Sequence, residues 1–208
     1  MADKKILDNI KKLREITGVG FSDCKAAITE TNGDLEKSIE YLRKKGIAKA
    51  SKKMSRVAAD GLILINEKDG NISAIEINSE TDFVAKNKDF VSFCKDVAEI
   101  NFKNQGDLDK LSKSKMKNDK TVEENLITLI SKIGEKITIR RSKFFNKEGK
   151  NYFYVHNSSE KNIGKVISIV KLTGQNKQDI DNVGTKLAMH IAAQSPIAIN
   201  KDGIKKNI

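Results

Sequence analysis

The sequence predicts an α+β fold, and three observations support this prediction. The first 46 residues carry three short apolar repeats at helical spacing, which indicate an N-terminal three-helix bundle. From residue 58 on, two β-branched runs are followed by helical patterns, and the same order of hairpin and helix begins again after residue 146. We therefore expect a core of two similar α+β subdomains with antiparallel sheets, the second of them incomplete. The predicted parts are 1–46 (bundle), 47–57 (basic linker), 58–145 (first subdomain) and 146–208 (second subdomain).

Glycines end each helix of the predicted bundle. The first helical pattern runs to Ile16 and breaks at residues 17–20, Thr-Gly-Val-Gly. The second ends at Asn32-Gly33, as a left-handed helix terminus would, and the third is capped by Asp34 and closed at Gly46. Three helices this short indicate a small bundle of the ubiquitin-associated type, with a thin core.

Parts of this region allow more than one interpretation. Either Ser22 or Asp23 could cap the second helix. Phe21 follows two glycines that would let the backbone approach a partner closely, but its ring could equally fold back into the bundle. Residues 47–57 carry basic side chains among alanines and serines without an apolar stripe, which predicts a solvated helical linker.

The first core subdomain opens with a predicted hairpin. Residues 61–66 and 72–78 are apolar, β-branched runs, and Asp69-Gly70 between them is a strong turn signal. A helix follows, with apolar residues at helical spacing from Phe90 to Ile100. Residues 106–119 are polar and are expected to form a connection without regular structure.

The rest of the core follows the same pattern. Thr121 is expected to cap a helix, with Glu124 completing a capping box and Gly134 ending it. Residues 136–145 alternate as a strand. The second subdomain has strands predicted at 152–156 and 166–172, followed by an amphipathic helix at 183–193. After Pro196 the sequence predicts no second helix and no closing strand, so strand positions would be left unpaired unless the subdomain continues.

The cap of one helix decides where Phe83 points. If the helix after the hairpin begins at Asp82, Phe83 lies seven residues before Phe90, on the buried face. If it begins at Asn87, residues 81–86 form a tight loop that can hold Phe83 in water. The residues alone leave both arrangements open.

Composition indicates a water-soluble globular protein. The chain has 208 residues, 38% of them hydrophobic and 32% charged, which is enough for a sizeable core. It contains no apolar run of membrane-spanning length and no signal-peptide pattern, so we expect a cytoplasmic protein without membrane contact. Cys24 and Cys94 have no second Cys or His at ligand spacing, which favours buried, reduced thiols over a disulfide or a metal site.

The sequence also argues against catalysis. His156 and His190 have no Ser or Cys partner in a recognisable motif, and no glycine-rich loop could cradle phosphate. We therefore expect a binding protein that is not an enzyme, with no cofactor and no small-molecule substrate. The net charge of +11 comes almost entirely from lysine, whereas bidentate reading of bases and phosphates favours arginine, so no specific nucleic-acid partner is expected. A basic RNA- or ribosome-associated binding protein is the alternative function.

Residues 81–87, Thr-Asp-Phe-Val-Ala-Lys-Asn, resemble the signature loop of bacterial elongation factor Ts, a family of guanine-nucleotide exchange factors for elongation factor Tu. In this family the Asp-Phe pair is presented to the partner GTPase, and the phenylalanine wedges into its nucleotide-binding domain. The resemblance implies that Asp82 and Phe83 form the intruding pair here. Residues 13–20 and 23–25 resemble the opening of the same family, a module that also docks on the GTPase.

Three more stretches are similar to this family. Residues 132–137 with Arg140-Arg141 resemble its Ile-Gly-Glu turn, and Tyr-Val-His at 154–156 resembles a strand end that reaches the other end of elongation factor Tu. Residues 187–193 resemble a packing helix of its second subdomain. The resemblance thus implies a factor that binds elongation factor Tu and promotes GDP release in translation elongation. The residues that it implies for partner binding are Thr81, Asp82, Phe83, Val84, Ala85, Lys86, Asn87, Arg14, Phe21, Ser22, Ile133, Gly134, Glu135 and His156.

Overall fold

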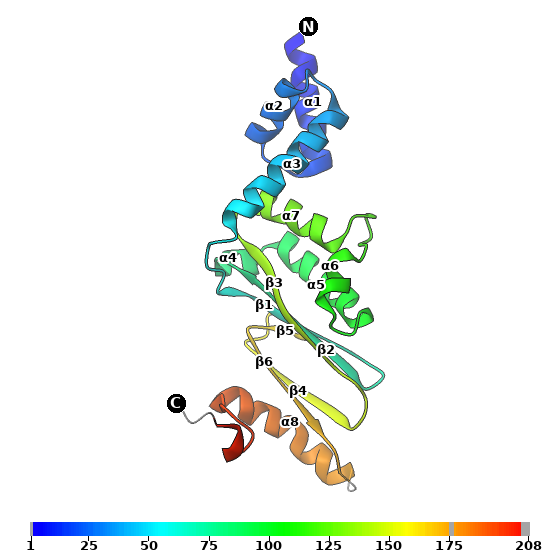
Figure 1. Cartoon of the computed structure of the whole chain (residues 1–208), viewed down its shortest axis with the longest axis vertical. Helices are drawn as coiled ribbons and strands as arrows, with labels where there is room; N and C mark the ends of the chain where they lie inside the picture. The colour runs from blue at the N-terminus through cyan, green and yellow to red at the C-terminus, as the bar shows by residue number, and fades with distance from the viewer. Residues whose placement is uncertain (1, 175–176, 205–208) are drawn as a thin grey trace. The chain divides into compact units, whose positions relative to one another are not determined.

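The computed structural model describes residues 2–174 and 177–204. It contains both helices and antiparallel strands (Figure 1), which confirms the predicted α+β class. The chain divides into two compact units, each made of three segments: unit 1 of Met1–Gly61, Asn78–Phe93 and Ser112–Ile139, and unit 2 of Leu62–Ile77, Cys94–Leu111 and Arg140–Ile208. The boundaries expected at residues 46, 57 and 145 stay a prediction.

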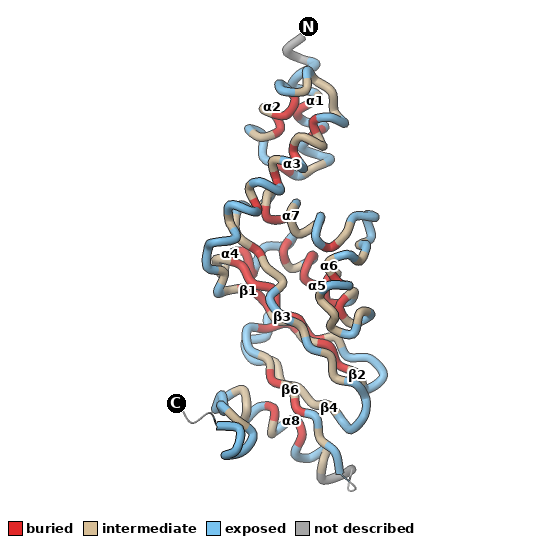
Figure 2. Tube along the Cα trace, in the orientation of Figure 1, coloured by how far each residue is buried: buried red, intermediate tan, exposed pale blue. Residues whose placement is uncertain are grey.

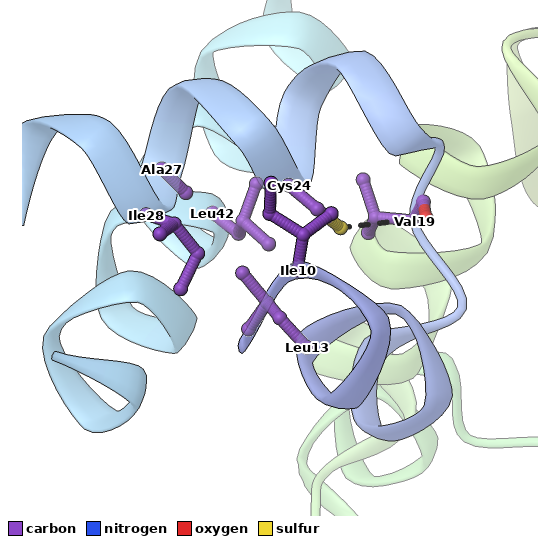
Figure 3. Packing of buried hydrophobic residues seen from close by; sticks show 7 residues of the cluster. All are labelled: Ile10, Leu13, Val19, Cys24, Ala27, Ile28 and Leu42. Atoms are coloured by element: carbon purple, nitrogen blue, oxygen red, sulfur yellow. Dashed lines mark hydrogen bonds between the residues drawn. The ribbon is translucent and has the colours of Figure 1, made fainter. Parts of the chain in front are cut away.

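Unit 1 begins with the predicted three-helix bundle, made of α1 (Ala2–Thr17), α2 (Phe21–Glu30) and α3 (Leu35–Lys53). Figure 3 shows its small core, to which all three helices contribute: Ile10, Leu13, Val19, Cys24, Ala27, Ile28 and Leu42. Asp34 caps α3 as predicted, because its Oδ1 accepts a hydrogen bond from the Lys37 backbone N–H at 3.0 Å. The left-handed φ angles of Asn32 and Gly33, +53° and +84°, confirm the predicted end of α2.

The predicted cap of α2 was wrong. The helix begins at Phe21, with Gly20 at the N-cap position and no side-chain cap. Ser22 is exposed, and Asp23 forms ion pairs with Lys45 and Lys49 of α3, at 3.2 and 2.7 Å. The carboxylate of Asp23 therefore joins two helices of the bundle.

The end of α3 was also predicted wrongly. The helix does not close at Gly46 but continues to Lys53, and Gly46 and Ala50 are buried. A Cβ atom at Gly46 would lie 2.7 Å from Ser131 Oγ, so this glycine lets α3 approach α7 (Val122–Ile133) closely. The expected solvated linker is thus partly a packed helix, although Lys52 and residues 54–57 are exposed.

The hairpin consists of β1 (Asp60–Lys68) and β2 (Asn71–Ser79), joined as predicted at Asp69-Gly70. Both turn residues have positive φ, +52° and +79°, as a tight hairpin turn requires. The sheet has the order β3-β2-β1-β5, where β3 is Ile137–Phe145 and β5 is Ile163–Gly164. Strand β5 was not predicted; it pairs antiparallel with β1, placing Ile63 opposite Gly164.

After β2 the chain forms the short helix α4 (Asp82–Ala85), the longer α5 (Lys88–Lys103) and the short α6 (Leu108–Lys113). Helix α6 lies in residues 106–119, where no regular structure was expected, and Asp107 Oδ1 accepts from the backbone N–H groups of residues 109 and 110. The capping box of Thr121 and Glu124 is present on α7, and Gly134 ends that helix with φ +89°. Both features confirm the predictions.

In unit 2, β4 (Lys150–His156) and β6 (Val166–Leu172) form a two-stranded antiparallel sheet, in register from Lys150 opposite Leu172 to His156 opposite Val166. Helix α8 (Lys177–Gln194) packs on both strands, so a hairpin followed by a helix recurs as predicted. The last described element is a 3₁₀ turn, η1 (Lys201–Gly203). Buried positions, red in Figure 2, are frequent along β1 and β2, whereas β4 has none.

In the described residues, no helix is both long and apolar enough to span a bilayer, and no three His, Cys, Asp or Glu side chains group as metal ligands. Cys24 and Cys94 are buried free thiols, as expected, and burial raises the pKa of each.

Candidate partner-binding site

Of the two helix caps predicted between β2 and α5, the one at Asn87 forms and the one at Asp82 does not: Asp82 is the first residue of α4, and Thr81 at the N-cap position makes no side-chain cap hydrogen bond. Thr81 precedes the single turn of α4, and Asn87 begins a new helix, since its Oδ1 accepts from the backbone N–H groups of Asp89 and Phe90 at 2.9 and 3.3 Å. The break between the helices takes Phe83 off the apolar face that carries the fully buried Phe90. Phe83 is 79% exposed, which confirms the second of the two arrangements left open by the sequence.

The helical turn that carries the exposed Phe83 is held in place by the two buried residues that follow it. Val84 and Ala85 are buried, with 5% and 4% of their surface exposed. Asp82 and Lys86 form an ion pair at 2.8 Å, and this interaction raises the pKa of Lys86. The pair is largely exposed, so it contributes little to stability. Burial of the two small apolar residues therefore fixes the turn, while the phenylalanine ring points away from the core.

Glu135 holds the start of the same turn. Its Oε2 accepts from the Thr81 backbone N–H at 3.0 Å, and its Oε1 accepts from Thr81 Oγ1 at 2.7 Å. Hydrogen bonds to a carboxylate are stronger than those between neutral groups. Glu135 was expected to contact the partner; in the free chain its two carboxylate oxygens bind the loop that presents Phe83.

A second carboxylate also joins the segment around residue 80 to the segment around residue 135. Here the carboxylate belongs to the first segment and the backbone N–H to the second. Glu80 Oε1 accepts from the Lys136 backbone N–H at 2.5 Å, and Glu80 also pairs with Arg56 at 3.3 Å. The hydrogen bond from Lys136, followed by that from Arg56, lowers the pKa of Glu80. The Lys136 ammonium donates to the carbonyls of Met54 and Arg56, at 2.6 and 2.8 Å. The chain after α3 is thereby fixed beside the Phe83 loop.

The predicted Ile-Gly-Glu turn forms at the end of α7. Ile133 is half-buried, and Gly134 is exposed in the left-handed conformation that ends the helix. The carbonyl of Gly134 accepts a hydrogen bond from the Lys53 ammonium. The turn thus lies between the end of α3 and the Phe83 loop, as part of the scaffold of the site.

The N-terminal module presents a second set of exposed candidates. Arg14 and Ser22 are exposed, and Phe21 is 46% exposed at the first position of α2. Val19, not Phe21, fills the bundle core. The ring of Phe21 therefore does not fold fully back into the bundle.

The loop between α1 and α2 is held close to the start of α5. Gly18 has φ +66°, and a Cβ atom there would lie 3.3 Å from the side chain of Lys132. The Lys132 ammonium pairs with Asp89 at 2.8 Å, two residues after Asn87. The module loop, the end of α7 and the segment that follows the Phe83 loop are thus linked within unit 1.

His156 is separate from these residues. It lies at the end of β4 in unit 2, exposed, with its Nδ1 3.2 Å from the Tyr154 hydroxyl. All other predicted partner-binding residues belong to unit 1. The supporting residues Glu80, Arg56 and Lys132 were not identified from the sequence, because their partners lie 24 or more residues away in the chain.

The chain is similar to known proteins over most of its length. A family model described as "Elongation factor TS" matches residues 80–208. Relatives named elongation factor Ts include those of Methylorubrum populi (41% identical over 198 residues), Xanthobacter autotrophicus (42% over 200) and Bartonella quintana (45% over 199). The alignments cover 94–95% of this chain but 64–65% of each of these relatives, so the chain spans slightly less than two thirds of their length.

Proposed function

Because the chain belongs to the elongation factor Ts family, we propose that it acts in translation elongation, by binding elongation factor Tu in the cytoplasm and promoting the release of GDP. The observation that supports this proposal most directly is the exposed ring of Phe83 within the family's signature loop. A large apolar side chain in water is unfavourable until a partner buries it, which is how anchor residues of interfaces behave.

The mechanism requires no covalent chemistry by this chain. An exchange factor that binds the nucleotide-free GTPase more tightly than the GDP-bound form must, by linkage, weaken GDP binding by the same factor. In this proposal Phe83 enters the nucleotide-binding domain as a wedge, and Asp82 meets polar groups beside it. The family resemblance suggests that this insertion strains the Mg²⁺ and phosphate contacts of the bound GDP.

The second contact of the proposal is the N-terminal module. Arg14, Phe21 and Ser22 would grip the nucleotide-binding domain from another side. Their side chains are exposed and belong to the same compact unit as the Phe83 loop. Contacts that are already ordered in the free protein lose less conformational entropy when the complex forms. His156, in unit 2, is proposed to reach a different part of elongation factor Tu.

The test is the release of fluorescent GDP from purified elongation factor Tu. We expect the full chain to accelerate release, and Phe83→Ala to lower kcat/KM for exchange about thirtyfold, the effect of losing an anchor worth about 2 kcal/mol. The melting temperature should change little, because the ring is exposed. Val183→Ala, which shortens a 51% exposed side chain in unit 2, is the matched control. Unchanged exchange by folded Phe83→Ala would remove the wedge from the mechanism, and binding of RNA without any effect on GDP release would favour the alternative function.

A further inference from the structure

Unit 2 contains an open groove of about 1010 Å³ that the proposed exchange mechanism does not use. Its walls come from the end of β1, the start of β2, the last turns of α5, the end of β3 and one residue of β6. Aromatic, basic, acidic and amide side chains line it.

Three half-buried phenylalanines form the apolar part of the groove. Phe102 of α5 and Phe144 of β3 pack edge to face, with ring centroids 5.7 Å apart and an interplanar angle of 64°. Phe145 follows on the same strand and also lines the groove. Aromatic rings that reach a groove give flat bases a surface on which to stack, whatever the sequence.

Three exposed lysines, Lys68, Lys103 and Lys171, lie along the same groove. Among the described residues, Lys68 and Lys103 take part in no ion pair, whereas Lys171 donates to the side chain of Asn146. Glu67 and Glu99 also line the groove, so the cations exceed the carboxylates by one. This balance predicts modest, salt-dependent attraction for phosphates.

The groove is preformed, because hydrogen bonds hold its walls together. The side-chain nitrogen of Asn151 donates to the carbonyls of Gly70 and Asn146, each at 2.9 Å, and the Lys147 backbone N–H donates to Asn71 Oδ1 at 3.0 Å. These contacts join the β1–β2 turn to the β3–β4 turn, which lie side by side in Figure 1. A site with fixed walls loses little entropy when a ligand enters.

We propose that this groove binds a short stretch of single-stranded nucleic acid without sequence preference. Bases stack on the phenylalanine rings, and Lys68 and Lys103 contact the phosphates. The side-chain amides of Asn66 and Gln105, which make no hydrogen bond to another described residue, are available to base edges. Nucleic-acid bases would use both the aromatic rings, for stacking, and the free amides, for hydrogen bonds. An acidic peptide would need only the lysines, so the lining fits nucleic acid better.

Fluorescence anisotropy with labelled twelve-nucleotide oligouridylate RNA and oligothymidylate DNA tests this proposal on the full chain. We expect both to bind at low salt. Lys68→Ala/Lys103→Ala should weaken binding and reduce the slope of log K against log [salt] by about 1.4, which corresponds to two phosphate contacts. Phe145→Leu, which keeps an apolar side chain but removes the ring, should weaken binding at least about fivefold. Because the groove is lined by none of the residues proposed to contact elongation factor Tu, GDP release without oligonucleotides should be unchanged in the lysine variant.

The control is Lys11→Ala/Lys12→Ala, which removes the same charge from exposed positions on α1. It should leave the affinity within about twofold of the wild type. An equal loss in this control and in the groove variant would show that only net charge matters and would overturn the proposal. Wild-type affinity in folded Phe145→Leu would also overturn it. Displacement of the oligonucleotides by poly-glutamate at equal charge concentration would assign the groove to an acidic polypeptide instead.

Discussion

Glu135 is expected to affect exchange through the loop that carries Phe83, because its carboxylate binds the start of that loop. Glu135→Ala removes the two hydrogen bonds to Thr81, at 3.0 and 2.7 Å. Bonds to a charged group contribute about 1.5–3 kcal/mol each. Glu135 is only half-buried and water competes for it, so about 1–2 kcal/mol is a reasonable total for the pair. If this energy is what orders the loop, exchange should fall about 5- to 30-fold.

The assay is kcat/KM for fluorescent GDP release from elongation factor Tu. Thr81→Val deletes only the hydroxyl bond and leaves the backbone N–H in place, so its loss should be smaller than that of Glu135→Ala. Because both variants break the same contact, the double variant should lose less than the product of the single losses. Glu30→Ala removes an exposed carboxylate elsewhere in unit 1 and should have no effect. Wild-type exchange by folded Glu135→Ala, or losses that simply multiply, would show that this contact does not present Phe83.

Two further predictions concern the scaffold. Gly46→Leu should destabilise the chain by about 1–3 kcal/mol, since even a Cβ atom would lie 2.7 Å from Ser131 Oγ; urea denaturation measures this, and a value near zero would mean that α3 does not pack closely on α7. The pKa of Glu80 is lower in the folded chain than the ordinary pKa of a glutamate, which applies to the unfolded chain. The ionised carboxylate therefore stabilises the fold above the pKa of the unfolded state. This stabilisation is lost as the pH falls through the lower pKa of the folded state. The unfolding free energy should therefore fall as the pH drops below about 4.5, the ordinary pKa of a glutamate, and less steeply in Glu80→Gln; parallel pH profiles for the two proteins would contradict this role.

Features that depend on neighbouring residues could be predicted from the sequence. The caps at Asp34 and Thr121 form because each side chain reaches a backbone N–H three residues further on. The turn at Asp69-Gly70 forms because both residues tolerate positive φ. The choice between Asp82 and Asn87 could not be made this way, because both residues lie where a helix begins in the structure.

Features that depend on distant contacts could not be predicted. Strand β5 has only two residues, too short for a pattern, and exists because β1 offers an edge for pairing. The sequence after Gly46 lacks an apolar stripe and predicts a solvated helical linker, but α3 continues to Lys53 with Gly46 close against α7 and Ala50 buried. Glu135 and Thr81 are 54 positions apart, so only the fold shows that they are partners. The family resemblance predicted partner-binding residues but did not indicate which of them support the others.

The continuity of α3 changes how the two exposed phenylalanines can act. With a flexible linker at 47–57, the N-terminal module would bind as a tethered unit, and its contribution would depend on an effective concentration set by the linker. In the structure α3 runs to Lys53, and Lys132 lies against Gly18 while it pairs with Asp89. Phe21 and Phe83 therefore belong to one compact unit, and neither ring has to be brought into place when the other binds. In the proposed mechanism, the ordering cost would then be met during folding rather than during exchange, which would leave more of the contact energy of the two rings to oppose GDP.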